Sequence, residues 1–144
     1  MGFKEAIRTC LFEKYITFSG RASRSEYWWF YLFLVLCLAT FAIIFAVVMS
    51  MQPSNTAIGV IFTILGLPLV ALYIPLISVM VRRFHDRDMS GWLVLVAMLA
   101  GAIPYIGVLI SIWFFVMTVM KGTEGDNRFG SDPLKLEHSE DVFA

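Results

Sequence analysis

The pair His85-Asp86 is the part of this sequence that most resembles catalytic or metal-binding chemistry. An imidazole oriented by a carboxylate is a usual general base and a common arrangement around zinc. Neighbouring residues on a helix point about 100° apart, however, and the chain contains no H-x-x-x-H or C-x-x-C spacing. We therefore expect no catalytic residue, no metal and no cofactor. His85 should make a hydrogen bond at a helix end, and Asp88 or Ser90 should cap the helix that follows.

Anion binding is the second chemistry that the charged residues suggest. Five arginines lie in the segments 18–30 and 81–92, more than the nearby carboxylates can neutralise. If the two helices beside them are antiparallel, Glu26 lies near Arg82 or Arg83, and an ion pair there would hold the helix ends in register. The excess guanidinium groups could instead hold an anionic lipid phosphate or a soluble anion. The candidate polar cluster, structural or lipid-binding, comprises Arg21, Arg24, Glu26, Arg82, Arg83, His85, Asp86, Arg87, Asn127 and Arg128.

The composition shows which elements must hold this cluster. Of the 144 residues, 59% are hydrophobic and 15% are charged, with a formal net charge of zero, whereas about a quarter of the residues in soluble domains are charged. No Lys, Arg, Asp or Glu occurs in 27–81 or in 89–120. These tracts exclude a soluble enzyme and predict an all-α integral membrane protein, whose function must lie in or on a bilayer.

The first charge-free tract predicts two complete transmembrane helices. At about 1.5 Å per residue, 27–51 exceeds the roughly 30 Å of hydrocarbon. Its start is marked by Ser23 and Glu26, which have the spacing of a capping box in which each side chain reaches the other's backbone N–H. The sequence Gln52-Pro53-Ser54-Asn55 predicts a short turn before a second helix over 56–81.

The second helix contains two prolines, Pro68 and Pro75, which predict kinks. A proline frees a backbone carbonyl one turn earlier, and this carbonyl could face water or a ligand. Neighbouring protein groups usually satisfy such carbonyls in membrane helices. We therefore interpret the kinks as a feature of packing.

The third tract, 92–120, is too long for one upright helix and too short for two complete ones. Gly101, Pro104 and Gly107 interrupt it. One kinked span would place the C-terminal residues on the far side of the membrane, whereas a hairpin of two short helices would return them to the side of the N-terminus. We prefer the hairpin, because it brings the polar segment 122–133 beside the other two charged segments.

The distribution of basic residues predicts the orientation and the domain organisation. Arginines precede the first span and follow the second, and none lies in the loop between them, so both basic segments should be cytoplasmic. Residues 3–14 have apolar side chains at helical spacing with charges between them, which predicts an amphipathic helix on the membrane surface. The predicted units are an amphipathic cytoplasmic helix in 1–18, a single transmembrane domain in 19–133 and an acidic disordered tail in 134–144.

Three motifs occur in order in this chain: FSGRASRSEYWWF in 18–30, VRRFHDRDMSGW in 81–92 and GTEGDNRFGSDP in 122–133. Over about 15–134 the chain closely resembles the domain-of-unknown-function 805 family, small integral proteins of bacterial inner membranes. Its departures from the family pattern, Asp88-Met89 and Ser131, are local. The resemblance implies a fold and a location in the bacterial inner membrane, but it implies no activity. We call these segments the first, second and third charged segments.

We consider three functions. The leading one is a non-enzymatic protein that associates with itself, with lipid, including anionic headgroups, or with a larger membrane assembly; no nucleic-acid partner is expected. The alternatives are an oligomeric transporter or channel component and a membrane-embedded enzyme that acts on lipid headgroups. An enzyme needs His85, Asp86 and Glu26 to converge on a cavity, whereas a pore needs a polar stripe along several spans.

Overall fold

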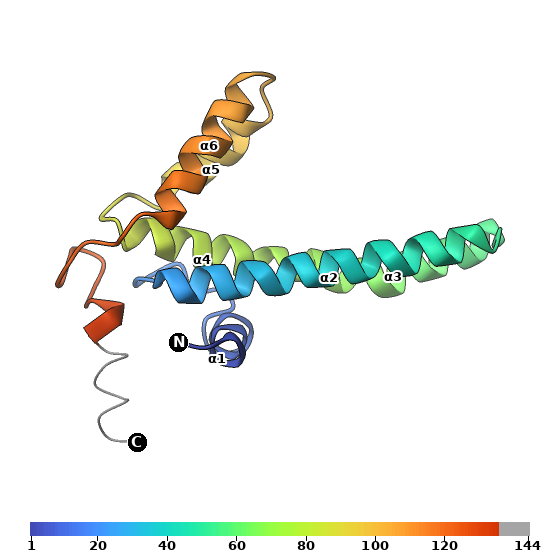
Figure 1. The fold of residues 1–144 in the computed structure, drawn as a ribbon, viewed down its shortest axis with the longest axis horizontal. Helices are drawn as coiled ribbons and strands as arrows, with labels where there is room; N and C mark the ends of the chain where they lie inside the picture. Colours follow the sequence, from blue (N-terminus) through green and yellow to red (C-terminus); the bar gives the residue numbers. More distant parts are fainter. Residues whose placement is uncertain (136–144) are drawn as a thin grey trace.

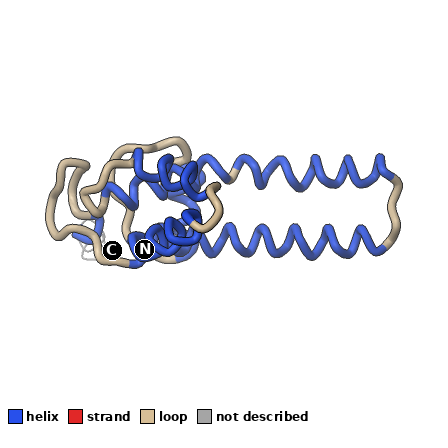
Figure 2. Tube along the Cα trace, turned by 90° about the horizontal axis from the view of Figure 1, so that it is seen from above, coloured by secondary structure: helices blue, strands red, loops and turns tan. Residues whose placement is uncertain are grey.

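The computed structural model describes residues 1–135, and every regular element within them is a helix. Helices α2 (Arg24–Ser50) and α3 (Asn55–Ala71) lie side by side, and α4 (Tyr73–His85) continues α3 (Figure 2). Helices α5 (Trp92–Gly101) and α6 (Ile106–Val119) form a shorter hairpin, which diverges from the long one at the end of α4 (Figure 1). The predicted all-α fold and the predicted short hairpin are confirmed.

Two helical stretches are long and apolar enough to cross a membrane. They are Arg24–Ser50, with 27 residues, and Asn55–His85, with 31 residues, and only 6% of the most apolar window of each is buried. A core helix of a soluble protein would be covered by other elements, whereas these helices present apolar side chains all round. The second stretch was expected to end near residue 81. It continues to His85, so Arg82 and Arg83 belong to the helix.

Serine side chains mark the first residues of both spans. The Ser23 hydroxyl accepts a hydrogen bond from the Glu26 N–H at 3.2 Å, and Ser54 accepts one from the Ala57 N–H at 3.3 Å. Each bond satisfies a free amide of the first helical turn. The prediction of a reciprocal capping box at α2 is wrong in its second half, because the Glu26 carboxylate turns to Arg82 instead of the Ser23 backbone.

The junction between α3 and α4 lies at Leu72, one turn before Pro75. Because proline has no N–H, Pro75 leaves the Ala71 carbonyl without its helical donor. The hydroxyl of Tyr15 supplies the missing donor, at 2.7 Å from the Ala71 oxygen. The expectation that a neighbouring protein group satisfies the carbonyl freed by a proline is confirmed at this position.

The short hairpin depends on the close approach of two glycines. A Cβ atom on Gly107 would collide with the Gly101 carbonyl, so only glycine permits the contact between the two helix ends. At the other end, α5 has Gly91 as its N-cap and no side-chain cap. The predicted cap by Asp88 or Ser90 is therefore wrong. Asp88 adopts φ 55° and directs its carboxylate to Arg128 instead.

The predicted amphipathic helix consists of α1 (Phe3–Arg8) and a π-helical turn, η1 (Thr9–Glu13). It lies across the long hairpin, and Figure 1 shows it end-on. One side of it is buried against α2 at Ala6 and Cys10, whereas Phe12 is 80% exposed. The hydrophobic core of the protein lies at this end of the molecule and includes Phe30 and Val79, whereas α3 has no buried residue.

Candidate functional site

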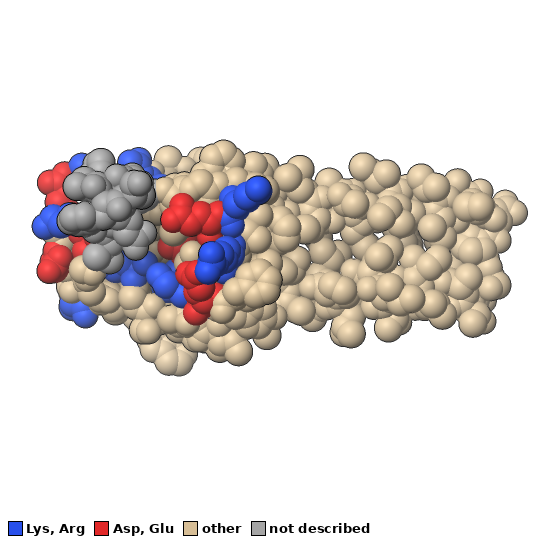
Figure 3. Space-filling view, turned by 90° about the horizontal axis from the view of Figure 1, so that it is seen from below, with Lys and Arg blue, Asp and Glu red and all other residues tan. Residues whose placement is uncertain are grey.

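The three charged segments meet at one end of the molecule. Figure 3 shows the Lys, Arg, Asp and Glu side chains gathered there, while the long hairpin extends away from them without a charge. Because α2 and α4 are antiparallel, the start of the first helix lies beside the end of the second. The turn of the short hairpin then returns the third charged segment to the same end. The fold therefore brings together segments about a hundred residues apart in sequence.

Glu26 and Arg82 form a buried ion pair between α2 and α4, as predicted. Their side chains are 3% and 0% exposed. Cys10 from η1 covers the pair, with its sulfur 3.8 Å from Glu26 Oε1 and 3.9 Å from an Arg82 nitrogen. Burial, followed by the negative charge of Glu26, raises the pKa of the Cys10 thiol to about 12, so the thiol stays protonated and donates its hydrogen to the carboxylate.

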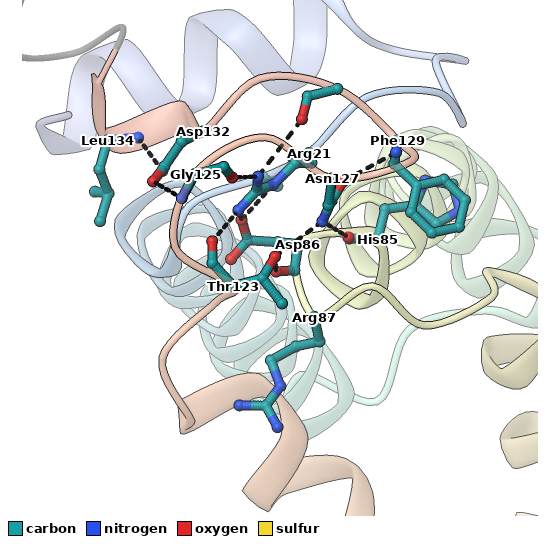
Figure 4. A network of polar contacts seen from close by, with 12 residues as sticks. Arg21, His85, Asp86, Arg87, Thr123, Gly125, Asn127, Phe129, Asp132 and Leu134 are labelled. Atoms are coloured by element: carbon teal, nitrogen blue, oxygen red, sulfur yellow. Dashed lines mark hydrogen bonds and ion pairs between the residues drawn. The ribbon is translucent and has the colours of Figure 1, made fainter.

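Asp86 accepts two arginines that come from different charged segments. Arg21 Nε lies 2.9 Å from Asp86 Oδ1, and Arg83 pairs with Oδ2 (Figure 4 shows Arg21 and Asp86). All three side chains are at least 95% buried in this arrangement. We call Arg21, Glu26, Arg82, Arg83 and Asp86 the arginine network.

Backbone carbonyls accept hydrogen bonds from the guanidinium N–H groups that do not bond to Glu26 or Asp86. Arg21 donates to the Thr123 carbonyl at 2.6 Å, and Arg83 Nε donates to the Thr118 carbonyl at 3.1 Å. Arg87 donates to the Lys121 carbonyl at 2.6 Å. These bonds anchor the end of α6 and the segment after it to the end of α4. The arginine surplus that suggested an anion in the sequence is thus largely satisfied inside the protein.

The third charged segment forms a structured turn, as its Gly, Asn, Asp and Pro content predicts. The Asn127 amide donates to the His85 carbonyl at 2.9 Å, and Asp132 accepts the backbone N–H groups of Gly125 and Leu134 at 3.1 and 3.0 Å (Figure 4). Burial raises the pKa of Asp132, but these two N–H groups, with the charge of Arg21, outweigh it and lower the pKa overall. The carboxylate is therefore ionised in the folded turn.

Both the ring nitrogen Nδ1 and the ring face of His85 are in contact with other parts of the protein. Its Nδ1 lies 3.2 Å from the Gly20 carbonyl, which can only accept, so Nδ1 carries the hydrogen. The ring stacks flat on Phe129, with centroids 3.9 Å apart. The guanidinium carbon of Arg128 lies over the Phe129 ring, 4.8 Å from its centroid, and Arg128 also pairs with Asp88. His85 and Asp86 thus have separate partners, and the expected hydrogen bond of His85 at a helix end is confirmed.

Arg24 is the one predicted cluster residue outside these contacts: among residues 1–135, it makes no ion pair and is exposed. It lines a cavity of about 600 Å³ beside the arginine network. Lys121, which pairs with Glu124 at 2.5 Å, lines the same cavity. The described part of the chain contains no group of three or more His, Cys, Asp or Glu residues that could hold a metal.

Three further residues contribute to this site without a clear signal in the sequence. Cys10 and Gly122 carry no charge, and Asp132 lies inside a motif without marking a contact. A Cβ atom on Gly122 would collide with the Asp86 carboxylate, so this glycine lets the third segment approach the network. Asp132 belongs to the motif in 122–133, which indicates that this residue matters. Its hydrogen-bond partners are backbone N–H groups, which no residue type in the sequence marks.

The fold and the site define a small integral membrane protein whose three charged segments lock together at one end. Residues 15–131 match the model of a family described as protein of unknown function (DUF805), and the chain belongs to this family.

Two Escherichia coli K12 proteins are similar to this chain over most of its length. The inner membrane protein YhaH is 39% identical over 125 residues, which cover 87% of this chain and 93% of YhaH. The inner membrane protein YhaI is 36% identical over 130 residues, which cover 84% of this chain and 89% of YhaI. No solved structure matches the chain. The relatives are inner membrane proteins by name, in agreement with the apolar spans described above.

Proposed function

We propose that this chain is a non-enzymatic, multi-pass protein of the bacterial inner membrane that binds anionic lipid headgroups at its cytoplasmic end. The observation that carries the proposal is the cavity of about 600 Å³ beside the arginine network. Its lining includes four cationic side chains and three carboxylates. The arginine network satisfies Arg21 and Arg83 internally. Arg24 makes no ion pair among residues 1–135, and the pair of Lys121 with Glu124 is exposed to solvent, so it can be exchanged for a ligand at little cost.

The charges around the spans support a cytoplasmic location for this end. All the arginines near the spans lie at the end of the molecule that holds the arginine network, and the loop between α2 and α3 has no charged residue. Positively charged loops stay on the cytoplasmic side of the inner membrane. The cytoplasmic leaflet attracts basic residues through its anionic lipids, so the cavity would face the lipid headgroups that its charge favours.

The contacts of the charged residues support a non-enzymatic role. An enzyme acting on headgroups would need His85, Asp86 and Glu26 to face a common substrate. Glu26 is instead paired with Arg82, Asp86 is shared by two arginines, and His85 stacks on Phe129. Each of these groups already has a partner that would have to leave before the group could act as an acid or base.

The hydroxyl groups of the spans do not favour a transport pathway. Thr40, Ser50 and Thr63 each donate to a carbonyl of their own helix, at 2.8, 2.6 and 2.9 Å. Such bonds leave no row of free donors along the spans for an ion or polar solute to follow. We therefore place binding of lipid above channel or transporter activity.

The proposal can be tested by measuring the thermal stability of the full-length protein in nanodiscs. Phosphatidylglycerol should replace part of the phosphatidylcholine in increasing fractions. A ligand that binds only the folded state raises the melting temperature, so phosphatidylglycerol should stabilise the parent protein. The Arg24→Gln, Lys121→Gln double variant should lose most of this stabilisation.

The matched control is the double variant Lys4→Gln, Arg8→Gln, which removes the same charge from exposed positions of α1. It should keep the stabilisation. Equal responses of the two double variants would contradict the proposed site, since general attraction of cations to the membrane would then suffice. Inorganic phosphate added in neutral detergent should leave the melting temperature unchanged, which separates a lipid from a soluble anion.

Self-association is a second candidate, favoured by the packing of the long hairpin. Helices α2 and α3 leave a groove of about 300 Å³ between them, lined by residues such as Phe41 and Leu65, and α3 buries no residue. A second copy could fill this groove. The mass of the protein assembly in nanodiscs formed at low protein-to-lipid ratio tests this, because a single copy per disc would exclude a stable dimer.

A further inference from the structure

A second cavity, of about 500 Å³, lies between the long and the short hairpin, which diverge from one another (Figure 1). Its walls come from the start of α2, the middle of α4 and both helices of the short hairpin. Trp28 of α2 and Phe115 of α6 meet there in a T-shaped contact with ring centroids 5.7 Å apart. The long and short hairpins therefore flank an open apolar hollow near the level of the first charged segment.

The chemistry of this hollow suits a hydrocarbon chain. Aromatic rings and aliphatic side chains form most of its lining. The hydroxyls of Ser111 and Thr118, which also line it, donate to the carbonyls of Gly107 and Phe115 in their own helix, both at 2.8 Å. Polar lining groups with internal partners offer little to a polar ligand, whereas the exposed rings and methyl groups offer dispersion contacts along their length.

The apolar hollow and the charged cavity lie end to end along the seam between α2 and α6. On α2, Arg24 lines the charged cavity, and Trp28, one turn later, lines the apolar one. Across the seam, Thr118 lines the apolar hollow and Lys121 the charged cavity. Arg83 lies between them and donates to the Thr118 carbonyl. A cationic site about one helical turn from an apolar one is complementary to a molecule with an anionic head and a hydrocarbon tail.

We propose that the apolar hollow holds an acyl chain of one anionic phospholipid whose phosphate lies at Arg24 and Lys121. This inference rests on the proposed headgroup site and adds the second half of the ligand. The divergence of the two hairpins would then have a role, because the angle between them leaves room for one acyl chain. The protein would bind this chain more tightly than the surrounding lipids do. Trp28 and Phe115 contact this chain.

Quenching of Trp28 fluorescence by brominated acyl chains tests the inference. A variant with Trp29, Trp92 and Trp113 replaced by phenylalanine retains Trp28 alone. It is placed in nanodiscs of phosphatidylcholine with a small fraction of one brominated lipid, either phosphatidylglycerol or phosphatidylcholine. Two cations near an anionic headgroup correspond to roughly thirtyfold enrichment of that lipid, so brominated phosphatidylglycerol should quench Trp28 at a correspondingly lower fraction than brominated phosphatidylcholine.

Two substitutions distinguish the acyl chain site from the headgroup site. Ser111→Leu adds bulk within the apolar hollow and should remove the preference for brominated phosphatidylglycerol, while Ser50→Leu, at the far end of α2, should preserve it. Equal quenching by both brominated lipids in the parent, together with stabilisation by phosphatidylglycerol that depends on Arg24, would overturn the acyl chain site and leave the headgroup site standing. Loss of both responses would overturn both proposals.

A measurement on the unaltered chain covers the case in which the single-tryptophan variant does not fold. Native mass spectrometry of protein released from mixed phosphatidylglycerol and phosphatidylcholine nanodiscs should show one retained phosphatidylglycerol. Ser111→Leu should lose it and Ser50→Leu should retain it. Retention of the lipid by Ser111→Leu, or its absence from the parent, would contradict the inference.

Discussion

The pair Glu26–Arg82 is the most completely buried charge interaction in the described structure. Its carboxylate is bonded to Arg82 and Cys10, and Arg82 Nε is the single buried side-chain polar atom without a partner among residues 1–135. Removing two charges from water is costly, and their attraction offsets this cost only while both remain. The pair therefore fixes the register of α2 against α4, and its net effect on stability depends on both members being present.

Substituting one member of this pair should be more damaging than substituting both. Glu26→Gln leaves the Arg82 charge buried without a counter-charge, which costs on the order of 3 to 5 kcal/mol. The double variant Glu26→Leu, Arg82→Met should recover most of that loss, because it leaves no charge behind. Unfolding by SDS in mixed micelles measures both values. A loss below about 1 kcal/mol for Glu26→Gln would indicate a water-exposed pair instead.

Gly122 offers a test of the Asp86 interactions without changing any charge. In Gly122→Ala, the new methyl group occupies the position of the Asp86 carboxylate, which must move away from Arg21 or Arg83. We expect a loss on the order of 3 kcal/mol, typical of a broken buried pair. Gly59→Ala is the control: its Cβ has no neighbour within 4 Å, and alanine in a helix interior is favoured by roughly 0.5 to 1 kcal/mol. Similar unfolding midpoints for the two variants would show that Asp86 can move freely.

The sequence predicted one part of this network and missed another for a physical reason. Two antiparallel charge-free spans place Glu26 opposite Arg82 or Arg83, so this contact follows from helix geometry alone. The contact between Arg21 and Asp86 depends on how the second segment leaves α4, and the bonds from Arg83 go to the backbone of Thr118 and Met120. Every residue has a carbonyl, so no residue type in the sequence marks these acceptors.

The elements of the fold were predicted well where hydrophobicity decides and less well where local polar contacts decide. The charge-free tracts gave both spans and the short hairpin. The last uncharged residue, 81, predicts too early an end for the second span, because charged side chains usually lie outside apolar helices. Ion pairs inside the protein instead allow Arg82 and Arg83 to be buried within α4. The cap of α5 was missed because Asp88, a good capping residue, bonds to Arg128 in the third charged segment.

The turn formed by the third charged segment should weaken as the pH falls. Asp132 has a lowered pKa in the folded protein, so its ionised form favours folding above the usual value of 3.8, and this contribution disappears as the pH falls through the lower folded value. Asp132→Asn should remove this dependence. Protection factors of the Gly125 and Leu134 amides against hydrogen exchange in detergent, relative to the intrinsic rate at each pH, should fall at acidic pH in the parent only.

Glu124 is a second carboxylate of this segment whose pKa is lowered, through its bond to Lys121 and the charge of Lys121, and it provides a control. Glu124→Gln removes an exposed carboxylate of the same segment, and it should leave the pH dependence of the two amides unchanged. If Glu124→Gln and Asp132→Asn flatten the profile equally, the effect belongs to the net charge of the segment and not to the two amide bonds of Asp132.

At the scale of the whole molecule, the N-terminus and the third charged segment lie at the same end of the fold (Figure 1), and the proposed topology places both on the cytoplasmic side. A thiol reagent that cannot cross the inner membrane should label Asn55→Cys, but not Glu124→Cys, when applied from the periplasmic side to a protein that lacks Cys10 and Cys37. Both positions are exposed in the structure. Labelling of Glu124→Cys alone would show that the protein has the opposite orientation. Labelling of both variants would show that residues 92–120 cross the bilayer as one span.

The long sequence separation between the arginine network and its carbonyl acceptors has a consequence for how the protein is made. Arg21 is among the first residues to leave the ribosome, but its carbonyl partners at Thr123 and Gly125 are synthesised more than a hundred residues later. Until then, both spans are available for insertion while Arg21 and Arg83 retain unsatisfied hydrogens beside Asp86. The bonds from the arginine network to these carbonyls can therefore form only after the short hairpin has been synthesised and has brought the chain back to this end of the molecule. The first and third charged segments are therefore joined late, by contacts that no shorter stretch of the chain can make.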